Sequence, residues 1–203
     1  AVDLNPMLGG CIDSLVERGT GDLFSYAVKR QPGEAGGLAL DILPSALYPG
    51  VLADVIYLNQ TIVPYREIRL SRKIPDGQWK DLAIAKTYRL PDQDQPVVEV
   101  AIEIRNDSAA AIAFSHRVQN VLPPADGIFS VPTRDWLTIF NRSAEAVRSI
   151  NSLVLKDLRA GWAARSYQGH KGICFHFDHN SVEKTYSYLT ASLDTLEWYH
   201  QSV

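Results

Sequence analysis

The stretch "HFDHN", from His176 to Asn180, brings together residue types that bind metal ions. If this stretch is extended, His176 and Asp178 project to the same face, about 7 Å apart, and His179 begins the following turn. Zinc requires three or four such ligands, and no matching second group is visible in the sequence. A strand end followed by a polar turn is the preferred interpretation, and we expect neither a metal nor another cofactor.

A second set of chemically capable residues, Arg134, Asp135 and Trp136, stands together in "TRDWLTIF". Aromatic residues make up 9% of the sequence, which contains four tryptophans and nine tyrosines. Sugar-binding clefts place flat aromatic rings against the apolar face of a pyranose and surround it with a few polar groups. The stretch therefore predicts sugar contacts by Arg134 and Trp136, although the same combination also occurs on ordinary strand surfaces.

The composition argues against two classes of partner. The 203 residues carry a net charge of −3 and contain no basic run that could follow phosphates, so we expect no nucleic-acid partner. No apolar run approaches the roughly 20 residues that a membrane-spanning helix requires, so we expect no membrane insertion. Hydrophobic residues make up 46% of the chain, which allows a sizeable core in one large domain or two small ones.

The two cysteines, Cys11 and Cys174, are too few for a disulfide framework. Each lies in an apolar, strand-like run. Two buried thiols are therefore the preferred interpretation, and one long-range disulfide is the alternative.

Strand signals dominate the sequence. In "VVEVAIEIRN", Val98, Val100, Ile102 and Ile104 alternate with mostly charged residues, which predicts a strand buried on one face. The turn cluster "NDSAA" and the run "AIAFSHRVQNVL" follow, so residues 97–122 are predicted to form an antiparallel hairpin. Similar runs, separated by turn-forming residues, occur before and after this segment.

Many strands joined by short turns predict an all-β fold, namely a large antiparallel β-sandwich with few short helices. Residues 143–155 are the main helix candidate, with an extended strand as the alternative. Because no linker or repeat is visible, residues 1–203 are predicted to form a single domain, with the Pro-Pro pair at 123–124 as the alternative boundary. The chain stops inside an expected strand, so we expect a domain truncated at its C-terminus.

The opening stretch "NPMLGGCIDSLVERGTGDLF" is predicted to form a hairpin, and it resembles the first hairpin of the galactose mutarotase-like supersandwich family. The segment "IAKTYRLPDQDQPVVEVAIEIRNDSAAAIAF" is similar to the middle hairpin of that family. The segment "TLEWYHQSV" is similar to a late strand that carries a glutamate. The resemblance covers most of the chain in order. It implies the fold shared by aldose epimerases, by accessory domains of α-mannosidases and glucanotransferases, and by polysaccharide lyases.

The resemblance also implies residue roles. In an aldose epimerase a carboxylate takes the proton from the anomeric hydroxyl, and a histidine gives a proton to the ring oxygen. Glu197 matches the carboxylate, and His116, His170 and His176 are the candidates for the histidine, with His116 as the preferred one. Arg117 lies at the cleft, and His176 is also a candidate substrate contact. The epimerase signature Asn-x-Thr-x-His-x-Tyr-x-Asn is matched only at Asn120. The structural alternatives are a solvent-facing Glu197 and a partly buried His116 bound to backbone.

These observations predict a carbohydrate-binding β-sandwich domain without catalytic activity, working beside a sugar-active enzyme or attached to another domain of the same parent protein. One alternative is an aldose-1-epimerase-like isomerase that uses the Glu197–His116 acid–base pair. The other is a structural domain whose sheets pack on a partner, which a large exposed apolar patch would favour.

Overall fold

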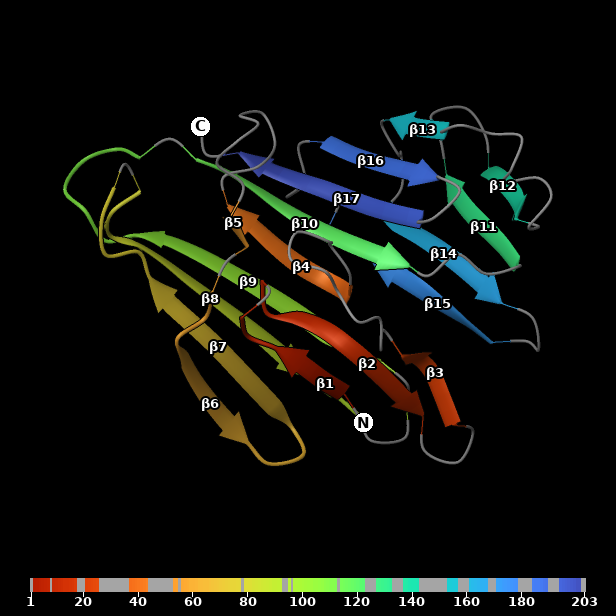
Figure 1. Ribbon diagram of the computed structural model, residues 1–203, viewed down its shortest axis with the longest axis horizontal. Helices are drawn as coiled ribbons and strands as arrows, with labels where there is room; N and C mark the ends of the chain where they lie inside the picture. The colour runs from red at the N-terminus through yellow and green to blue at the C-terminus, as the bar shows by residue number, and fades with distance from the viewer. Residues whose placement is uncertain are drawn as a thin grey trace.

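The computed structural model shows a chain built from strands and turns (Figure 1). The structure describes residues 2–7, 9–17, 21–25, 37–43, 53–54, 56–77, 79–92, 95, 97–112, 114–122, 127–132, 137–142, 153–156, 161–167, 171–178, 184–189 and 194–201. None of these residues is helical, so the predicted all-β fold class is confirmed. No helix in this part of the chain is long and apolar enough to cross a membrane.

Within the described residues, the largest sheet contains nine strands. Its order is β1 (Val2–Asn5), β2 (Cys11–Glu17), β4 (Gly37–Leu43), β10 (Ser115–Leu122), β17 (Asp194–Gln201), β16 (Lys184–Leu189) and β13 (Leu153–Lys156), with β3 (Gly21–Ser25) paired to β2 and β5 (Ala53–Asp54) paired to β4. The antiparallel pairing of β2 with β3 confirms the predicted opening hairpin. The C-terminal end of the helix candidate at 143–155 lies in β13, and residues 143–152 lie outside the described residues.

Two further sheets contain four strands each. One has the order β6 (Asn59–Val63), β7 (Glu67–Lys73), β8 (Leu82–Arg89) and β9 (Glu99–Asn106). The other has the order β12 (Leu137–Arg142), β11 (Gly127–Pro132), β14 (Trp162–Tyr167) and β15 (Lys171–His176). All the pairings between these strands are antiparallel.

The predicted hairpin at residues 97–122 is wrong in its pairing. Both strands form and the turn between them is present, since the Asn106 side chain accepts from the Ser108 amide at 2.9 Å and donates to the Ala110 carbonyl at 2.7 Å. However, β9 pairs with β8, whereas β10 pairs with β4 and β17 of the nine-stranded sheet. Residues 107–114 therefore carry the chain from one sheet to another.

The core lies between the sheets. Along β8, Leu82, Ile84, Lys86 and Tyr88 alternate with smaller or polar residues, and this face of the strand is buried. The largest core cluster joins residues from all three sheets and from the segment before β6: Ile12, Leu38, Tyr57, Leu70, Leu82, Ile84, Tyr88, Ala163 and Phe175. Ala85 and Thr87, on the opposite face of β8, are also buried, so it is the alternation of residue types that distinguishes the two faces.

Neither cysteine forms a disulfide, so the alternative of one long-range bridge is not realised. Cys11 is buried in β2, as predicted, and its thiol donates to the Asp13 carboxylate at 3.2 Å. Cys174 in β15 is exposed, which corrects the prediction of burial for this residue. Side chains alternate between the two faces of a strand, so Cys174 and its neighbour Phe175 point to opposite faces, and Phe175 is the buried one.

Candidate functional site

His116, the predicted catalytic histidine, is completely buried in β10. Val118 and Asn120 lie on the same face of β10 as His116 and are also buried, so this face points into the core. The Nε2 atom of His116 lies 3.1 Å from Oδ1 of Asp41 in the neighbouring strand β4. The predicted partial burial is thus corrected, since the ring is fully buried, with its Nε2 atom facing a carboxylate.

Asp41 is the centre of this buried polar cluster and belongs to the nine-stranded sheet. The Tyr57 hydroxyl donates to its Oδ2 atom at 2.5 Å. The same oxygen lies 2.9 Å from the Nζ atom of Lys86, which comes from β8 in the facing sheet. An ion pair with no exposed atoms on either side chain therefore connects two sheets.

The ammonium group of Lys86 has three acceptors, which match its three N–H groups. Besides Asp41, it donates to the backbone carbonyls of Gly9, at 3.1 Å, and Ala39. A charge removed from water is tolerated only when it is paired and hydrogen-bonded in this way. The geometry therefore favours a charged lysine that holds the surrounding backbone in place.

The protonation states of the cluster follow from burial and from the pairing. Burial alone would raise the pKa of Asp41, but the charge of Lys86 and the hydrogen bonds from His116 and Tyr57 outweigh it and lower that pKa below 3.8. Burial and the neighbouring carboxylate raise the pKa of Tyr57 far above its ordinary value, so this hydroxyl stays a donor. Burial lowers the pKa of Lys86, and Asp41 opposes that shift.

Unusual backbone conformations supply the acceptors of the cluster. Gly9 and Gly10 both have φ of +57°, and Ala39 has φ of +53°, in the left-handed region that favours glycine. The Ala39 amide donates to Asn120 at 2.8 Å, and the Tyr88 hydroxyl donates to the Gly10 carbonyl. Because non-glycine residues rarely adopt this conformation, Ala39 is a strained position held by its surroundings.

The Gly-Gly step in "NPMLGG" is required for a second reason. A Cβ atom added to Gly10 would lie 2.9 Å from side-chain carbons of both Leu70 and Tyr57. Glycine therefore lets the backbone approach the core closely at this turn. The sequence placed the pair in a hairpin but gave no indication of this contact.

Two other predicted site residues are placed by the pairing of β10 with its neighbours. The backbone of Glu197 in β17 lies opposite Gln119, whereas His116 lies opposite His200. Positions 116 and 119 belong to opposite faces of β10, because side chains alternate along a strand. Arg117 is half-buried and follows His116, so it also points away from the cluster. The Glu197–His116 acid–base pair stays a prediction.

The remaining predicted residues lie elsewhere or cannot be placed. His176 ends β15 and is exposed, as is Asp178. Among the described residues, no group of three or more histidine, cysteine or acidic side chains could hold a metal ion. Arg134 and Trp136, the predicted sugar contacts, lie outside the residues that the structure describes.

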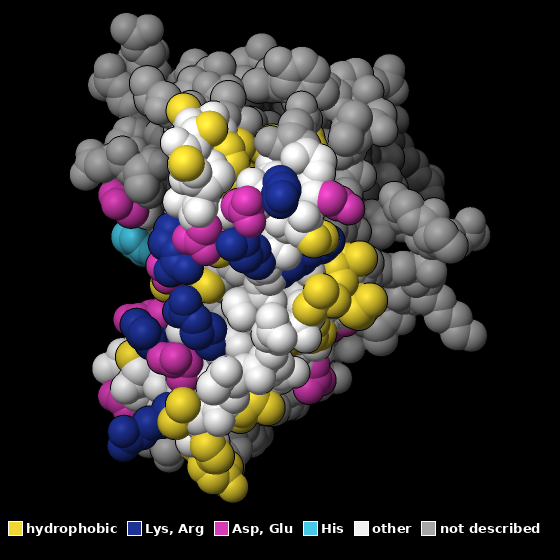
Figure 2. All heavy atoms as spheres, turned by 90° about the vertical axis from the view of Figure 1, so that its left-hand side faces the viewer, with side chains coloured by type: hydrophobic (Ala, Val, Ile, Leu, Met, Phe, Trp, Pro, Cys, Tyr) yellow, Lys and Arg dark blue, Asp and Glu magenta, His cyan; other side chains and the backbone are white. Residues whose placement is uncertain are grey.

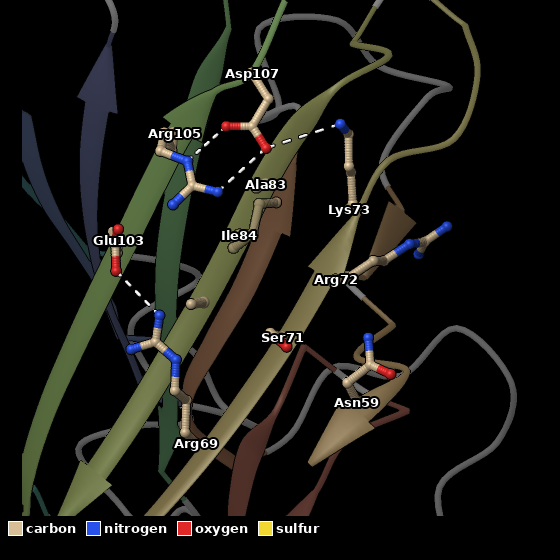
Figure 3. A pocket seen from close by; sticks show the side chains of 11 residues that line it. Asn59, Arg69, Ser71, Arg72, Lys73, Ala83, Ile84, Glu103, Arg105 and Asp107 are labelled. Carbon is tan, nitrogen blue, oxygen red and sulfur yellow. Dashed lines mark hydrogen bonds and ion pairs between the residues drawn. The ribbon is translucent and has the colours of Figure 1, made fainter. Parts of the chain in front are cut away.

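An open groove of about 270 Å³ lies on the outer face of the β6–β9 sheet (Figure 3). Ser71, Ala83 and Ala85 form its floor of short side chains, in which Ala85 is only 9% exposed. The register explains this arrangement, since Asn59 lies opposite Ser71, Ser71 opposite Ala85, and Ala85 opposite Glu103. Longer polar side chains surround this floor: Asn59, Arg69, Lys73, Glu103, Arg105 and Asp107.

The walls of the groove carry paired charges. Arg69 contacts Glu103 at 3.1 Å, and Arg105 contacts Asp107 at 2.5 Å. The Lys73 ammonium lies 3.8 Å from Asp107 and also forms an ion pair outside the groove. The hydrogen bond and charge of Arg105 lower the pKa of Asp107, so the pair is ionised at neutral pH. Figure 2 shows acidic and basic side chains interleaved on one side of the molecule.

This arrangement offers hydrogen-bond donors and acceptors together. Arg72 also borders the groove, but it lies between Ser71 and Lys73 in β7 and so belongs to the other face of the strand. Its side chain donates to the Ile56 carbonyl at 3.3 Å. Since each of the three other cations faces a carboxylate, the groove suits a ligand rich in hydroxyl groups better than one with a high charge.

Sequence reasoning missed most of the groove. The signal was present in "REIRLSRKI", where Arg69, Ser71 and Lys73 occupy alternate positions, and in "VVEVAIEIRN", where Glu103 and Arg105 do the same. Each run indicated only a solvent-facing strand surface. The groove appears once the register places the small residues of β7 and β8 between charged neighbours.

Comparisons with known proteins bear on the fold. No protein-family model and no curated protein matches the chain. Among solved structures, the chain is similar to Slr1438 from Synechocystis sp. PCC 6803, with a TM-score of 0.62 and 13% sequence identity. The alignment covers 98% of this chain and 80% of Slr1438. At this identity the likeness shows a shared fold and says nothing about activity.

Proposed function

We propose that the chain is a carbohydrate-binding β-sandwich domain without catalytic activity, and that the sugar lies in the groove on the β6–β9 sheet. The observation that carries this proposal is the combination of a small-residue floor with polar walls. The alanine side chains of the floor suit the C–H face of a sugar ring. The surrounding amide, guanidinium and carboxylate groups suit its hydroxyls.

The paired charges support a sugar as the ligand. Sugar hydroxyls both donate and accept hydrogen bonds. The walls supply donors and acceptors, the guanidinium and carboxylate groups, on strands of the same sheet. Arg69 and Glu103 are both substantially exposed, so their remaining hydrogen-bonding atoms are accessible to a ligand. A hydrogen bond to a charged group contributes about 1.5–3 kcal/mol, and a few of them support measurable affinity.

The surroundings of His116 favour binding without isomerisation. An aldose epimerase requires a histidine that touches the sugar ring, but His116 has no exposed surface and faces Asp41. A ring could reach it only if the ion pair between Asp41 and Lys86 were separated. The energetic cost of exposing these buried charges makes the epimerase alternative the weaker one.

Saturation-transfer NMR with a panel of neutral and acidic mono- and oligosaccharides tests the proposal on the intact chain. We expect saturation transfer from the protein to at least one neutral sugar. Replacing Glu103 or Arg105 with alanine should raise its Kd about tenfold, which corresponds to one lost charged hydrogen bond.

Arg89→Ala is the matched control for this experiment. Arg89 is exposed on the same sheet and contacts Glu67 at 2.7 Å, but it lies outside the groove. Its loss should leave sugar binding unchanged. No saturation transfer to any sugar, or an equal loss of binding in the Arg89 variant, would contradict the proposal.

A further inference from the structure

The two edges of the β6–β9 sheet differ in charge. All five residues of β6 are exposed, and none of them is charged. The opposite edge strand, β9, carries Glu99, Glu103 and Arg105. Sheet edges expose unpaired backbone groups, and monomeric proteins usually protect them with charged residues, bulges or prolines. By this criterion β9 is protected against pairing with another strand, and β6 is not.

Apolar side chains gather along the same edge. Leu58, Ile62, Val63 and Tyr65 are 70%, 58%, 46% and 84% exposed, respectively. They lie in β6, just before it or in the following turn, at the lower left of Figure 1. Within the described part of the chain, β7 is the only strand that pairs with β6. Exposed apolar residues beside an open strand edge indicate a protein contact surface.

We propose that β6 pairs with β6 of a second copy of this chain, antiparallel and centred on Thr61, to join two four-stranded sheets. A twofold interface must be complementary to itself. This register places Thr61 opposite its own copy, Asn59 opposite Val63, and Gln60 opposite Ile62. The uncharged strand therefore meets an uncharged strand, and no like charges face each other across the pairing.

The pairing would also complete the groove. The row that runs from Glu103 through Ala85 and Ser71 to Asn59 ends at β6, the edge strand of this sheet among the described residues. In the dimer this row continues into Val63 and then Glu67 of the second copy, because these two residues are cross-strand neighbours. The second copy thus supplies a wall on the β6 side. The dimer itself is independent of sugar binding.

Sedimentation equilibrium of the intact chain, from micromolar to millimolar concentration, tests the pairing. We expect a reversible monomer–dimer equilibrium, since one strand pair buries less surface than a standard interface. Thr61→Lys places two lysines opposite each other and should raise the dimer Kd about tenfold. Ala101→Lys is the control, since Ala101 lies in the same register row at the opposite edge and should leave the Kd unchanged.

Disulfide trapping tests the register without relying on the lysine variant. Residues opposite each other in an antiparallel pair have Cα atoms about 4.5–5.5 Å apart, within the range of a disulfide. In a Cys174→Ser background, Thr61→Cys should form covalent dimers with oxidised glutathione, and Ala101→Cys should not. A monomer at every concentration, equal effects of the two lysine variants, or equal crosslinking of the two cysteine variants would overturn the proposal.

Discussion

Strand β8 separates two groups of charges that are alike in chemistry and opposite in environment. Lys86 points into the core and meets Asp41, and neither side chain has any exposed surface. On the outer face of the same sheet, Arg69 meets Glu103 with both side chains about half exposed. The distances are similar, 2.9 and 3.1 Å, so solvent decides what each pair contributes. Water screens the outer pair, whereas the inner pair interacts in a low dielectric.

A buried pair and an exposed pair therefore have different uses in this molecule. Removing one partner of the buried pair leaves a charge without compensation, so the pair fixes how the two sheets face each other. The exposed pairs contribute little to stability and can exchange their partners for a ligand. The outer face is therefore suited to binding, and the inner face to holding the fold.

The largest effect is expected for Lys86→Met. This change leaves Asp41 buried without its cation and the carbonyls of Gly9 and Ala39 without their donor. We expect a loss of about 3–5 kcal/mol in the free energy of unfolding, measured by urea denaturation. Lys73→Met, which removes an exposed lysine of the same sheet, should cost less than about 1 kcal/mol. Similar losses in the two variants would contradict the assigned role of the buried pair.

A smaller loss is expected for Gly10→Ala. The new Cβ would meet Leu70 and Tyr57 at 2.9 Å and would also occupy a left-handed conformation. We expect a cost of about 2–4 kcal/mol by thermal or urea unfolding. Gly77→Ala is the control, because Gly77 has φ of +76° but no neighbour within 4 Å, so only the conformational cost of about 1–2 kcal/mol applies. Equal costs would mean that the side chains of Leu70 and Tyr57 move to make room for the new Cβ.

The smallest effect is expected for Arg69→Met, which removes the exposed pair with Glu103 and a hydrogen bond of 3.3 Å to Thr87. The loss should be about 0.2–1 kcal/mol and should shrink at molar salt, because ions screen exposed charges. The loss in Lys86→Met should change little over the same salt range. A salt-independent cost for Arg69→Met would remove the distinction between the two faces.

Local patterns predicted the strands well and their partners poorly. The alternation in "VVEVAIEIRN" predicted the strand β9 correctly, but its apolar face is only half-buried at Ile102 and Ile104 and is exposed at Val100. Period two also does not encode which strand lies alongside, so the 97–122 hairpin was wrong. The pattern in "LAIAKTYRL" places Lys86 on the apolar face of its strand, and this signal alone indicates a buried charge. Its partner Asp41 lies 45 positions earlier and becomes identifiable only when two sheets face each other.

The candidate site was predictable only in part. His116 was recognised as a residue of interest, but its burial depends on which face of β10 points into the core, which the sequence does not specify. The groove depends on the registers of three strand pairs, each of which can shift without changing the local pattern. Trp136 and Arg134 lie outside the described residues, so their sugar contacts stay predictions.

The buried cluster also has a consequence for the order in which the chain folds. Its hydrogen bonds join residues far apart in sequence, with separations of 77 for Lys86 to Gly9, 78 for Tyr88 to Gly10 and 81 for Ala39 to Asn120. Contacts of such long range make folding slow. During synthesis on the ribosome, Ala39, a strained residue of β4, can gain its partner Asn120 only after β10 has emerged. Until β10 has emerged, we expect the apolar faces of the N-terminal strands to be exposed and accessible to chaperones.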